Sequence, residues 1–418
     1  MRPLRTRGAV AAIAAAAGGL AAALALLPPS GPAPTDAALA ADTASAEAAS
    51  GPWLTGYWHN FDNGSTTMPL SEVPAEYTMV AVAFADNLAG TPGGITFNLA
   101  SSELGGYTEQ QFKDDIAAMQ AEGRKVVISV GGEKGHVDVT NPEQAAGFAQ
   151  SAHALMQEYG FDGVDIDLEH GMNARYMEDA LRDLRSRAGS GLVVTMAPQT
   201  IDFQAPSYDY YKLAESIPDI LTIVNMQYYN SGSMMGCDQQ VYSQGTVDFL
   251  TAQACIQLEL GLRPDQVGLG LPATPQAAGG GHQPTSNVIA ALDCLEEGTN
   301  CGSFTPSQPY GPIGGVMTWS INWDATNDYQ FAKDISARLG GGGTGPTPSP
   351  TPSPSPDPSP SPTGSAEPCD APAWDAGTVY TGGDRVAYEG TVYEARHWTR
   401  GDTPQDSQWG PWKAVGAC

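Results

Sequence analysis

Three acidic residues at alternate positions form the segment of the sequence best suited to chemistry. Asp165, Asp167 and Glu169 are interleaved with Val, Ile and Leu in the segment 163–169. Side chains alternate between the faces of a strand, so a strand here places the three acids on one face. Like charges this close cannot all ionise, and at least one carboxyl pKa must rise. A carboxyl with a raised pKa is suited to act as a general acid near neutral pH.

Two other interpretations of these acids fit the sequence less well. A solvated acidic strand edge would not alternate perfectly with apolar residues. A cation site is compatible with carboxylates, but His170 is the only histidine nearby at ligand spacing. We therefore expect catalysis without a metal ion or cofactor. Asp162 has the opposite parity, and we expect it to make buried structural hydrogen bonds at the start of the strand.

The elements that must position these acids follow a repeating pattern of strand and helix. Apolar runs predict buried parallel strands at 53–59, 79–85, 125–131, 163–169, 192–197, 221–229, 267–271 and 315–322. Helical spacing predicts helices at 109–122, 143–159, 174–187, 246–260, 287–296 and 329–339, and a weaker one in the first crossover, 61–77.

Eight strands with helical crossovers in roughly 290 residues predict an α/β fold, the (β/α)8 TIM barrel. A doubly wound open sheet is the alternative. Neither a Gly-x-Gly-x-x-Gly turn nor a P-loop supports it. In a barrel the chemistry lies at the C-terminal ends of the strands, and the polar residues of this chain fall there.

The segment Asp-Gly-Val-Asp-Ile-Asp-Leu-Glu at 162–169 resembles the Asp-x-x-Asp-x-Asp-x-Glu signature of family 18 glycoside hydrolases. Those enzymes are TIM barrels with the signature on the fourth strand, where the predicted order places it. The other resembling strand ends are Ser129-Val130-Gly131-Gly132, Met196-Ala197-Pro198-Gln199, Gln227-Tyr228-Tyr229-Asn230 and Trp319. The resemblance covers nearly all of residues 51–339.

The resemblance implies a chitinase that cleaves β-1,4 bonds between N-acetylglucosamine units with retention, by substrate-assisted catalysis. Glu169 would protonate the leaving oxygen while the substrate's own 2-acetamido oxygen attacks the anomeric carbon. Glu169 would then act as the base for water. Asp167 would orient the acetamido N–H and share a proton with Asp165, and Tyr229 would hydrogen-bond the acetamido oxygen.

The remaining predicted contacts bind the substrate. Gln227 and Asn230 would hold the sugar, and Trp319 would form the floor beneath it. Met196 and Tyr57 would line the groove, and Trp58 and Asp324 are further candidates for it. Between the last two predicted strands, the stretch 271–314 has little beyond one helix and a Gly-rich loop. The α+β insertion that deepens the cleft of some family members is therefore missing, and we expect an open groove and endo-type cleavage.

A composition break divides the chain into two domains. Residues 340–368 are a Gly run followed by repeated Thr-Pro and Ser-Pro, which favours an extended spacer and cannot form a core. We therefore expect a catalytic barrel at 51–339, a linker at 340–368 and a small module at 369–418.

The small module resembles the chitin-binding modules of carbohydrate-binding families 5 and 12. The residues that carry this resemblance are Ala373-Trp374, Tyr380, Gly383-Asp384, Val386, Tyr393-Glu394-Ala395, Trp398-Thr399, Gly401-Asp402 and Trp409. Alternating runs at 385–388 and 391–395 predict a β-hairpin. Such modules stack exposed aromatic rings on sugar faces, and we expect Trp398 and then Tyr393 to do so here.

The N-terminus predicts export. A basic start, a long Ala/Leu-rich run and the small-residue site Ala38-Leu39-Ala40 indicate a secretory signal within residues 1–41. An uncleaved anchor helix is the alternative interpretation. Six cysteines in an exported chain indicate disulfides, and six allow 15 pairings. Sequence proximity favours Cys237–Cys255, Cys294–Cys301 and Cys369–Cys418.

The net charge of −27 limits the partners of the protein. It disfavours nucleic acid and anionic lipid, which require clustered Lys and Arg. It suits a secreted, extracellular monomer acting on a neutral polymer such as chitin. The alternative functions are an endo-β-N-acetylglucosaminidase acting on N-glycans or peptidoglycan, and a lectin built on an inactive barrel.

Overall fold

The computed structural model describes residues 52–340 and parts of the C-terminal region, namely 371–375, 378–380, 383–395, 399–400, 403–404 and 412–417. The chain divides into two compact units, with the boundary between Gly345 and Pro346. The N-terminal leader and the linker predicted from the sequence lie outside the described residues. In the described part of the chain, every helix is too short or too polar to cross a membrane.

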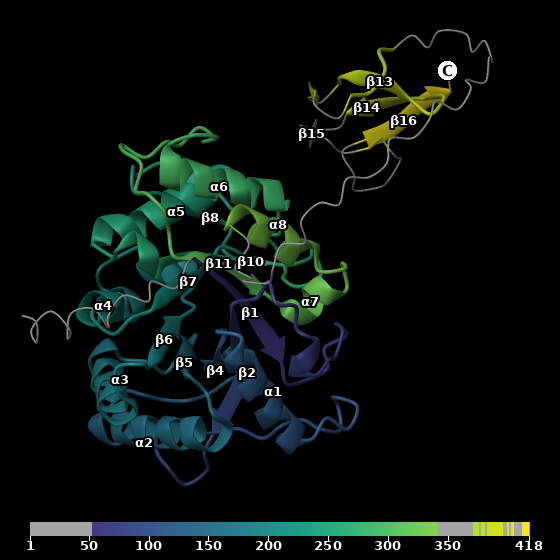
Figure 1. Ribbon diagram of the computed structural model, residues 1–418. Coiled ribbons are helices and arrows are strands. Elements are labelled where there is room, and N and C mark those ends of the chain that lie inside the picture. Colours follow the sequence, from purple (N-terminus) through teal and green to yellow (C-terminus); the bar gives the residue numbers. More distant parts are fainter. Residues whose placement is uncertain are drawn as a thin grey trace, which may run out of the picture. The chain divides into compact units, whose positions relative to one another are not determined.

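The first unit is a closed barrel of eight parallel strands, which confirms the predicted fold class (Figure 1). Its strands are β1 (Trp53–His59), β2 (Met79–Asn87), β4 (Lys125–Gly131), β5 (Gly163–Asp167), β6 (Val193–Met196), β7 (Ile223–Gln227), β10 (Val267–Pro272) and β11 (Gly315–Trp319). Each strand pairs with the next, and β1 pairs with both β2 and β11, which closes the ring.

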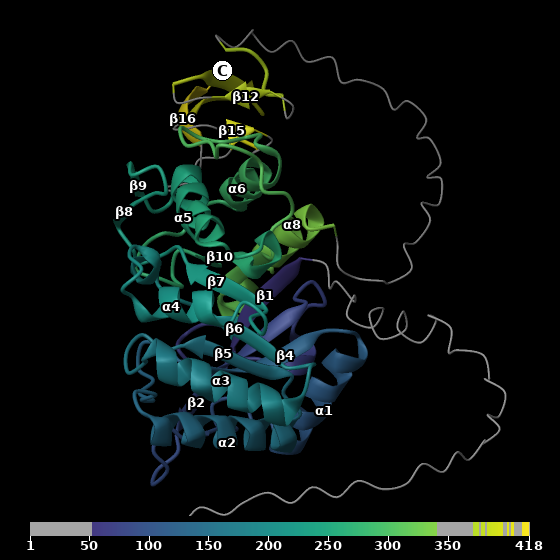
Figure 2. The ribbon, with the colours of Figure 1, turned by 90° about the vertical axis from the view of Figure 1, so that its left-hand side faces the viewer.

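Helices surround the strands, as the two views in Figures 1 and 2 show. They are α1 (Glu109–Ala121), α2 (Pro142–Tyr159), α3 (Ala174–Ala188), α4 (Asp209–Ser216), α5 (Val247–Leu260), α6 (Thr285–Glu297), α7 (Ile321–Ala325) and α8 (Gln330–Arg338). Short 3-10 turns are η1 (Leu70–Glu72), η2 (Thr200–Phe203) and η3 (Pro264–Gln266). Capping side chains fix several starts: Thr108 accepts from the backbone N–H of Gln111, and Asn141 from that of Gln144.

The first crossover differs from the prediction. Instead of a helix over 61–77, it contains only the turn η1. Arg124 replaces helical hydrogen bonds there by donating to the carbonyl oxygens of Val73, Pro74 and Tyr77. The segment was also too rich in Pro, Gly and Asn to sustain a helix.

Four predicted strands end earlier than expected. The segment 163–169 is a strand only to Asp167, 192–197 only to Met196, 221–229 only to Gln227 and 315–322 only to Trp319. Ser320 follows Trp319 as an N-cap, with its hydroxyl accepting from the N–H of Trp323, so Asn322 lies in α7. The early ends of β5 and β7 place Glu169, Tyr229 and Asn230 beyond the strands, at the mouth of the barrel.

The apolar face of β5 packs outward against the helices, as its alternation predicts. Val164, Ile166 and Leu168 are buried in the main core between sheet and helices. A smaller core fills the barrel interior and includes Val127, Val193 and Met317. The opposite face of β5, which carries the acids, therefore points into the barrel.

Two additional hairpins extend from the strand ends. β3 (Ile95–Thr96) pairs with the end of β2, and β8 (Ser233–Met235) pairs with β9 (Val241–Ser243) after β7. The disulfide Cys237–Cys255 ties the second hairpin to α5, and Cys294–Cys301 closes the turn after α6. These two predicted pairings are confirmed, whereas Cys369 and Cys418 lie outside the described residues.

The second unit is a small all-β module. Its strands are β12 (Val379–Tyr380), β13 (Arg385–Tyr388), β14 (Thr391–Ala395), β15 (Thr399–Arg400) and β16 (Trp412–Ala417). β13 and β14 form the predicted hairpin, and β14 also pairs with β16. Its core contains Val386 and Trp412, with Tyr393 partly buried against them.

Candidate active site

Asp165 is the deepest of the three acids and is held by three hydroxyl groups. Tyr57 Oη and Ser129 Oγ donate to its Oδ2 at 2.7 Å each, and Thr195 Oγ1 donates to its Oδ1 at 2.6 Å. Ser129 and Thr195 are the direct neighbours of Asp165 in the flanking strands β4 and β6. Burial raises the pKa of Asp165, and the three donors partly offset that rise by stabilising the carboxylate.

Asp167 lies one layer nearer the mouth and is 5% exposed. Gln227 Nε2, at the end of β7, donates to its Oδ1 at 2.8 Å and also to the carbonyl of Ala197. Burial raises the pKa of Asp167 well above its usual range, and the charges of Asp165 and Glu169 raise it further. The ionisation of Asp167 is therefore opposed both by burial and by the two neighbouring acids.

Glu169 lies beyond the end of β5 and is exposed, unlike the two acids beneath it. Partial burial raises the pKa of Glu169, and the charge of Glu133 raises it further, while His170 acts in the opposite direction. Of the three acids, Glu169 alone both reaches solvent and retains a proton to higher pH than an ordinary glutamate. This is the arrangement that a general acid requires.

Gly131 explains the Ser-Val-Gly-Gly sequence at the end of β4. It pairs with Asp167, and a side chain at this position would place Cβ only 2.0 Å from the Asp167 carbonyl oxygen. Its φ of +122° also favours glycine. The next residue, Gly132, donates its N–H to the same carbonyl at 2.8 Å. These contacts fix the end of β5, from which Glu169 projects.

An aromatic cluster surrounds Trp319, the half-buried residue at the end of β11. The Trp319 ring lies 4.7 Å from His59, 5.4 Å from Tyr57 and, stacked, 5.8 Å from Phe84, between centroids. His59 stacks in turn on Phe61 at 4.5 Å. Burial lowers the pKa of His59 to about 3, so its imidazole ring is neutral near neutral pH.

Tyr229 and Asn230 follow β7 at the same end of the barrel. Tyr229 is 8% exposed, and its pKa is raised well above the usual range by burial and by the charges of the three acids. Its hydroxyl is therefore a neutral donor next to the acids. Asn230 is exposed, has a φ of 52°, and donates its backbone N–H to Gly280.

The structure gives several predicted groove residues another role. Tyr57 is 1% exposed and bonds to Asp165, so it is a positioning group beneath Trp319 rather than a groove contact. Met196 is fully buried, because it pairs with Ile166 and shares its helix-facing side. Trp58 donates Nε1 to Met68 O, and Asp324 accepts from Tyr77, which places both in the core.

His59, Phe61 and Phe84 were not predicted from the sequence as part of the site. His59 and Phe61 continue the inward alternation that starts at Tyr57, so a period of two along β1 was the available signal. Asp162 was predicted correctly as a structural group, since it accepts from Gln120, from Lys125 and from the N–H of Val126. In the C-terminal module, Trp398 lies outside the described residues, and Tyr393 is partly exposed on β14.

Two family models match the chain. The model of glycosyl hydrolases family 18 matches residues 54–335, and that of carbohydrate-binding module family 5/12 matches residues 373–413. The first range covers nearly all of the barrel, and the second covers most of the small module.

Relatives and solved structures agree with these matches. "Chitinase D" of Niallia circulans is 37% identical over 67% of this chain and 60% of its own length. "Exochitinase 1" of Streptomyces olivaceoviridis is 33% identical over 69% of this chain and 56% of its own length. The chain thus spans less than two thirds of the length of these relatives.

Among solved structures, a Streptomyces coelicolor protein with the provisional name Chitinase A is 58% identical, with a TM-score of 0.68. It covers 69% of this chain and 98% of its own. A family GH18 chitinase from Chromobacterium violaceum is 35% identical, with a TM-score of 0.64, and covers 69% of this chain and 83% of its own.

Proposed function

The chain belongs to glycosyl hydrolase family 18, and from that premise we propose that it is a chitinase. It hydrolyses the β-1,4 bonds between N-acetylglucosamine units of chitin with retention of configuration. The observation that carries this proposal is the depth order of the acids. Asp165 and Asp167 are 1% and 5% exposed, and only Glu169 reaches the open mouth.

Retaining hydrolysis needs a proton donor and a nucleophile, but Glu169 is the one acid of the three that reaches the mouth. Most retaining glycosidases use a second carboxylate as nucleophile. Asp165 is enclosed by three hydroxyl groups, and Asp167 is held below the mouth by Gln227. Neither carboxylate is therefore placed to attack the anomeric carbon of a sugar bound at the mouth. The substrate's 2-acetamido oxygen supplies the nucleophile instead and forms an oxazolinium ion.

Each group then has a defined part in the reaction. Glu169 donates its proton to the leaving oxygen and afterwards takes a proton from the attacking water. Asp167 accepts a hydrogen bond from the acetamido N–H as its own proton moves toward Asp165. The neutral hydroxyl of Tyr229 donates to the acetamido oxygen, and Trp319 forms the floor under the reacting sugar.

Binding of the polymer involves both units. Gln227 and Asn230 lie at the end of β7, beside the reacting position, and contact the bound chain. Trp398 and Tyr393 of the C-terminal module stack on chitin. The stretch between β10 and β11, residues 273–314, contains α6 and no strand, which supports an open groove and endo-type cleavage. The disulfides of the described residues, Cys237–Cys255 and Cys294–Cys301, and the N-terminal pattern support export to the extracellular space, where the protein acts as a monomer.

Product analysis on three polymers tests this proposal. The full-length protein is incubated with colloidal chitin, cellulose and a high-mannose glycoprotein. We expect soluble N-acetylglucosamine oligomers from chitin alone, formed first as the β-anomer by proton NMR. An α-anomer would contradict substrate-assisted retention. Release of glycans from the glycoprotein without chitin hydrolysis would instead establish an endo-β-N-acetylglucosaminidase, and binding without any product would indicate a lectin.

A further inference from the structure

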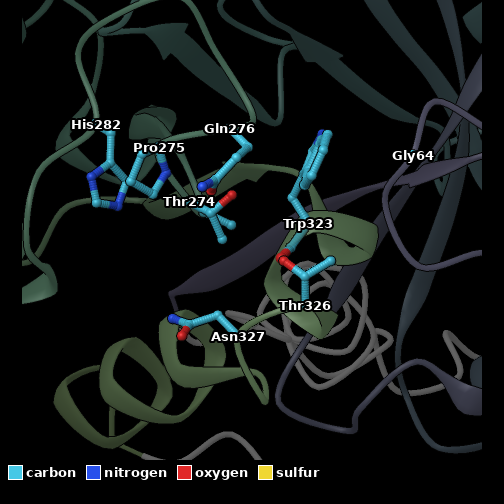
Figure 3. A pocket seen from close by; sticks show the side chains of 9 residues that line it. Gly64, Thr274, Pro275, Gln276, His282, Trp323, Thr326 and Asn327 are labelled. Atoms are coloured by element: carbon cyan, nitrogen blue, oxygen red, sulfur yellow. The ribbon is translucent and has the colours of Figure 1, made fainter.

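The loop that follows β1 contains Asn63 and Gly64, the one Asn-Gly pair in the whole sequence. Both residues are exposed to solvent. Gly64 also contributes to the lining of a pocket of about 480 Å³, which it shares with residues such as Thr274, His282, Trp323 and Asn327 (Figure 3). The lining comes from the segments after β1, β10 and β11, so the loop lies at the mouth of the barrel.

An asparagine that precedes glycine is open to attack by its own backbone. The nitrogen of the next residue reaches the side-chain carbon Cγ, and a five-membered ring forms. A side chain on that next residue hinders the approach, whereas glycine has none and adopts a wide range of φ and ψ. Gly64 has a φ of +88°, and beyond its chain neighbours no described atom lies within 4 Å of a Cβ built there. The Gly64 nitrogen therefore meets little steric resistance.

Hydrogen bonds within the loop supply the assistance that this attack needs. The N–H of Gly64 donates to Oδ1 of Asp62 at 2.9 Å, so a carboxylate lies next to the proton that the attacking nitrogen must lose. Oδ1 of Asn63 accepts from the hydroxyl of Ser65 at 2.7 Å and from its N–H at 3.3 Å. These two donors polarise the side-chain carbonyl and stabilise the negative charge that develops on its oxygen.

The reaction that this arrangement favours is deamidation. The Gly64 nitrogen bonds to Cγ of Asn63, its proton passes by way of Asp62 to the amide nitrogen Nδ2, and the Cγ–Nδ2 bond breaks to release ammonia. Water then opens the resulting succinimide at either of its carbonyl carbons. Opening at Cγ gives aspartate, and opening at the backbone carbonyl gives isoaspartate, which lengthens the main chain by a methylene group. Either product has a carboxylate in place of a neutral amide.

Hydrogen bonds connect the modified position to the reacting centre. Because the hydroxyl of Ser65 donates to Asn63, its oxygen accepts from Nδ1 of His59, at 3.3 Å. The ring of His59 lies 4.7 Å from that of Trp319 between centroids. A carboxylate at position 63 therefore places a charge beside a buried neutral ring, and that ring supports the predicted floor of the reacting sugar.

The backbone of the same loop is bound to the segment that follows Trp319. His59 donates its N–H to Oδ1 of Asn322 at 2.8 Å, and Nδ2 of Asn322 donates to the carbonyl of Thr66 at 2.8 Å. The N–H of Thr66 donates in turn to the carbonyl of Asn322 at 3.2 Å. Asn63 lies between these two attachment points, so an inserted methylene group changes the length of the chain that joins them.

We propose that this loop promotes the deamidation of Asn63, and that the modification slowly lowers the activity of the enzyme. The covalent step depends on the loop alone, whereas its effect on the rate rests on the proposed chitinase function. The protein thereby carries a limit on its own active lifetime. Conversion should be faster at higher pH, because the attacking nitrogen must lose its proton.

Peptide mass spectrometry tests the covalent step in the full-length protein. After several days in mildly alkaline buffer, the peptide with Asn63 should gain the mass difference between an OH and an NH₂ group. Asn327 is the internal control, because it is exposed in the same pocket but precedes Asp328. Asn63 should convert at least about tenfold faster than Asn327, and Gly64→Ala should slow its conversion about tenfold. Equal conversion of the two asparagines would overturn the site.

Ser65→Ala separates assistance by the loop from the ordinary chemistry of asparagine. Loss of the hydroxyl donor should slow the conversion of Asn63 about threefold or more. The matched control is Thr67→Ala, because the exposed hydroxyl of Thr67 makes no hydrogen bond within the described part of the chain. This control should convert at the parent rate. An unchanged rate in Ser65→Ala would refute the claim that the loop promotes its own modification.

Activity on soluble chitin oligomers tests the consequence. Asn63→Asp introduces the carboxylate directly and should lower kcat/KM about three- to tenfold, because small displacements around the reacting sugar reduce the rate. Asn63→Ser keeps a neutral side chain that can accept from the same backbone N–H, and it should stay near the parent value. During incubation the parent should lose activity in step with the conversion of Asn63, while Gly64→Ala and Asn63→Ser retain theirs.

The outcomes separate this inference from the function on which it partly rests. If Asn63 converts while the activity of the parent stays constant, the consequence is wrong although the chitinase stands. If the fresh parent releases nothing from colloidal chitin, the proposed function and the loss of activity both fail, and the mass change at Asn63 still decides the covalent step. An unmodified Asn63 after incubation would overturn the whole inference.

Discussion

At the scale of single residues, the site depends on the different burial of three carboxyl groups from one segment: Asp165 and Asp167 are buried, and Glu169 is exposed. The alternation of acids and apolar residues was enough to predict that Asp165, Asp167 and Glu169 share a face. Their donors were harder to foresee. Ser129 and Tyr57 lie on other strands, and only the register across the barrel brings their hydroxyls onto Asp165. Sequence reasoning has no access to that register, which explains why Tyr57 was placed in the groove.

Replacement of Tyr57 tests whether this network positions the proton. Tyr57→Phe removes one donor to Asp165, which makes the carboxylate of Asp165 less favourable and disturbs its sharing of a proton with Asp167. A hydrogen bond to a charged group contributes about 1.5–3 kcal/mol, so kcat should fall roughly 10- to 100-fold on soluble chitin oligomers. The matched control is Tyr77→Phe, because Tyr77 makes the same 2.7 Å bond to the buried Asp324. The control should lower stability only, and an equal fall of kcat in both variants would refute the positioning role.

The pH profile depends on Glu133. Glu169 must be protonated to act as acid, so activity is present below its pKa in the folded protein and is lost as pH rises through it. The charge of Glu133 raises that pKa. Glu133→Gln should therefore shift the alkaline limb of kcat/KM to lower pH. Glu215→Gln, an exposed control on α4, should leave the limb in place. A limb that stays in place or moves to higher pH in Glu133→Gln would contradict the assignment of Glu169.

At the scale of elements, the strands were predicted well and their ends were not. Apolar runs mark a buried strand, but hydrogen bonds of loops decide where it stops. Trp319 ends β11 because Ser320 caps the next helix. The short α4 was missed for a related reason. Its 8 residues give only two turns, too few for a helical period to stand out.

Gly131 tests how closely the ends of β4 and β5 must approach. In Gly131→Ala the new Cβ would lie 2.0 Å from the Asp167 carbonyl oxygen at a positive φ. We expect a loss of about 2–4 kcal/mol in the free energy of unfolding, together with a fall in kcat as Glu169 shifts. Gly123→Ala is the control, since its φ is also positive and no atom lies within 4 Å of its Cβ. It should cost only about 1 kcal/mol in urea unfolding and leave kcat unchanged. Equal costs in both variants would mean that the close approach is not important.

At the scale of the whole molecule, composition alone separated the barrel from the small module. A Pro/Ser/Thr-rich stretch between two blocks with aromatic and apolar residues predicts a linker between two domains without any structure. The pocket lined by Thr274, His282 and Trp323 could not be predicted from composition, because its lining comes from segments that follow three different strands.

The division into two units predicts a separation of tasks. A chain that ends at Gly345 retains the barrel and should keep parent kcat/KM on soluble chitin oligomers. On insoluble chitin its rate should fall about three- to tenfold, because the module no longer raises the local concentration of the enzyme at the polymer. Product release from both substrates measures this. Equal losses on soluble and insoluble substrates would show that the module serves the barrel in some other way.

The central claim is that Glu169 is the proton donor and that the substrate supplies the nucleophile. The most direct measurement compares the parent with Glu169→Gln on colloidal chitin, following both release of soluble oligomers and binding to the polymer. The account predicts that the variant binds chitin like the parent and releases products about 10²- to 10⁴-fold more slowly. A variant that keeps the parent rate would contradict the account.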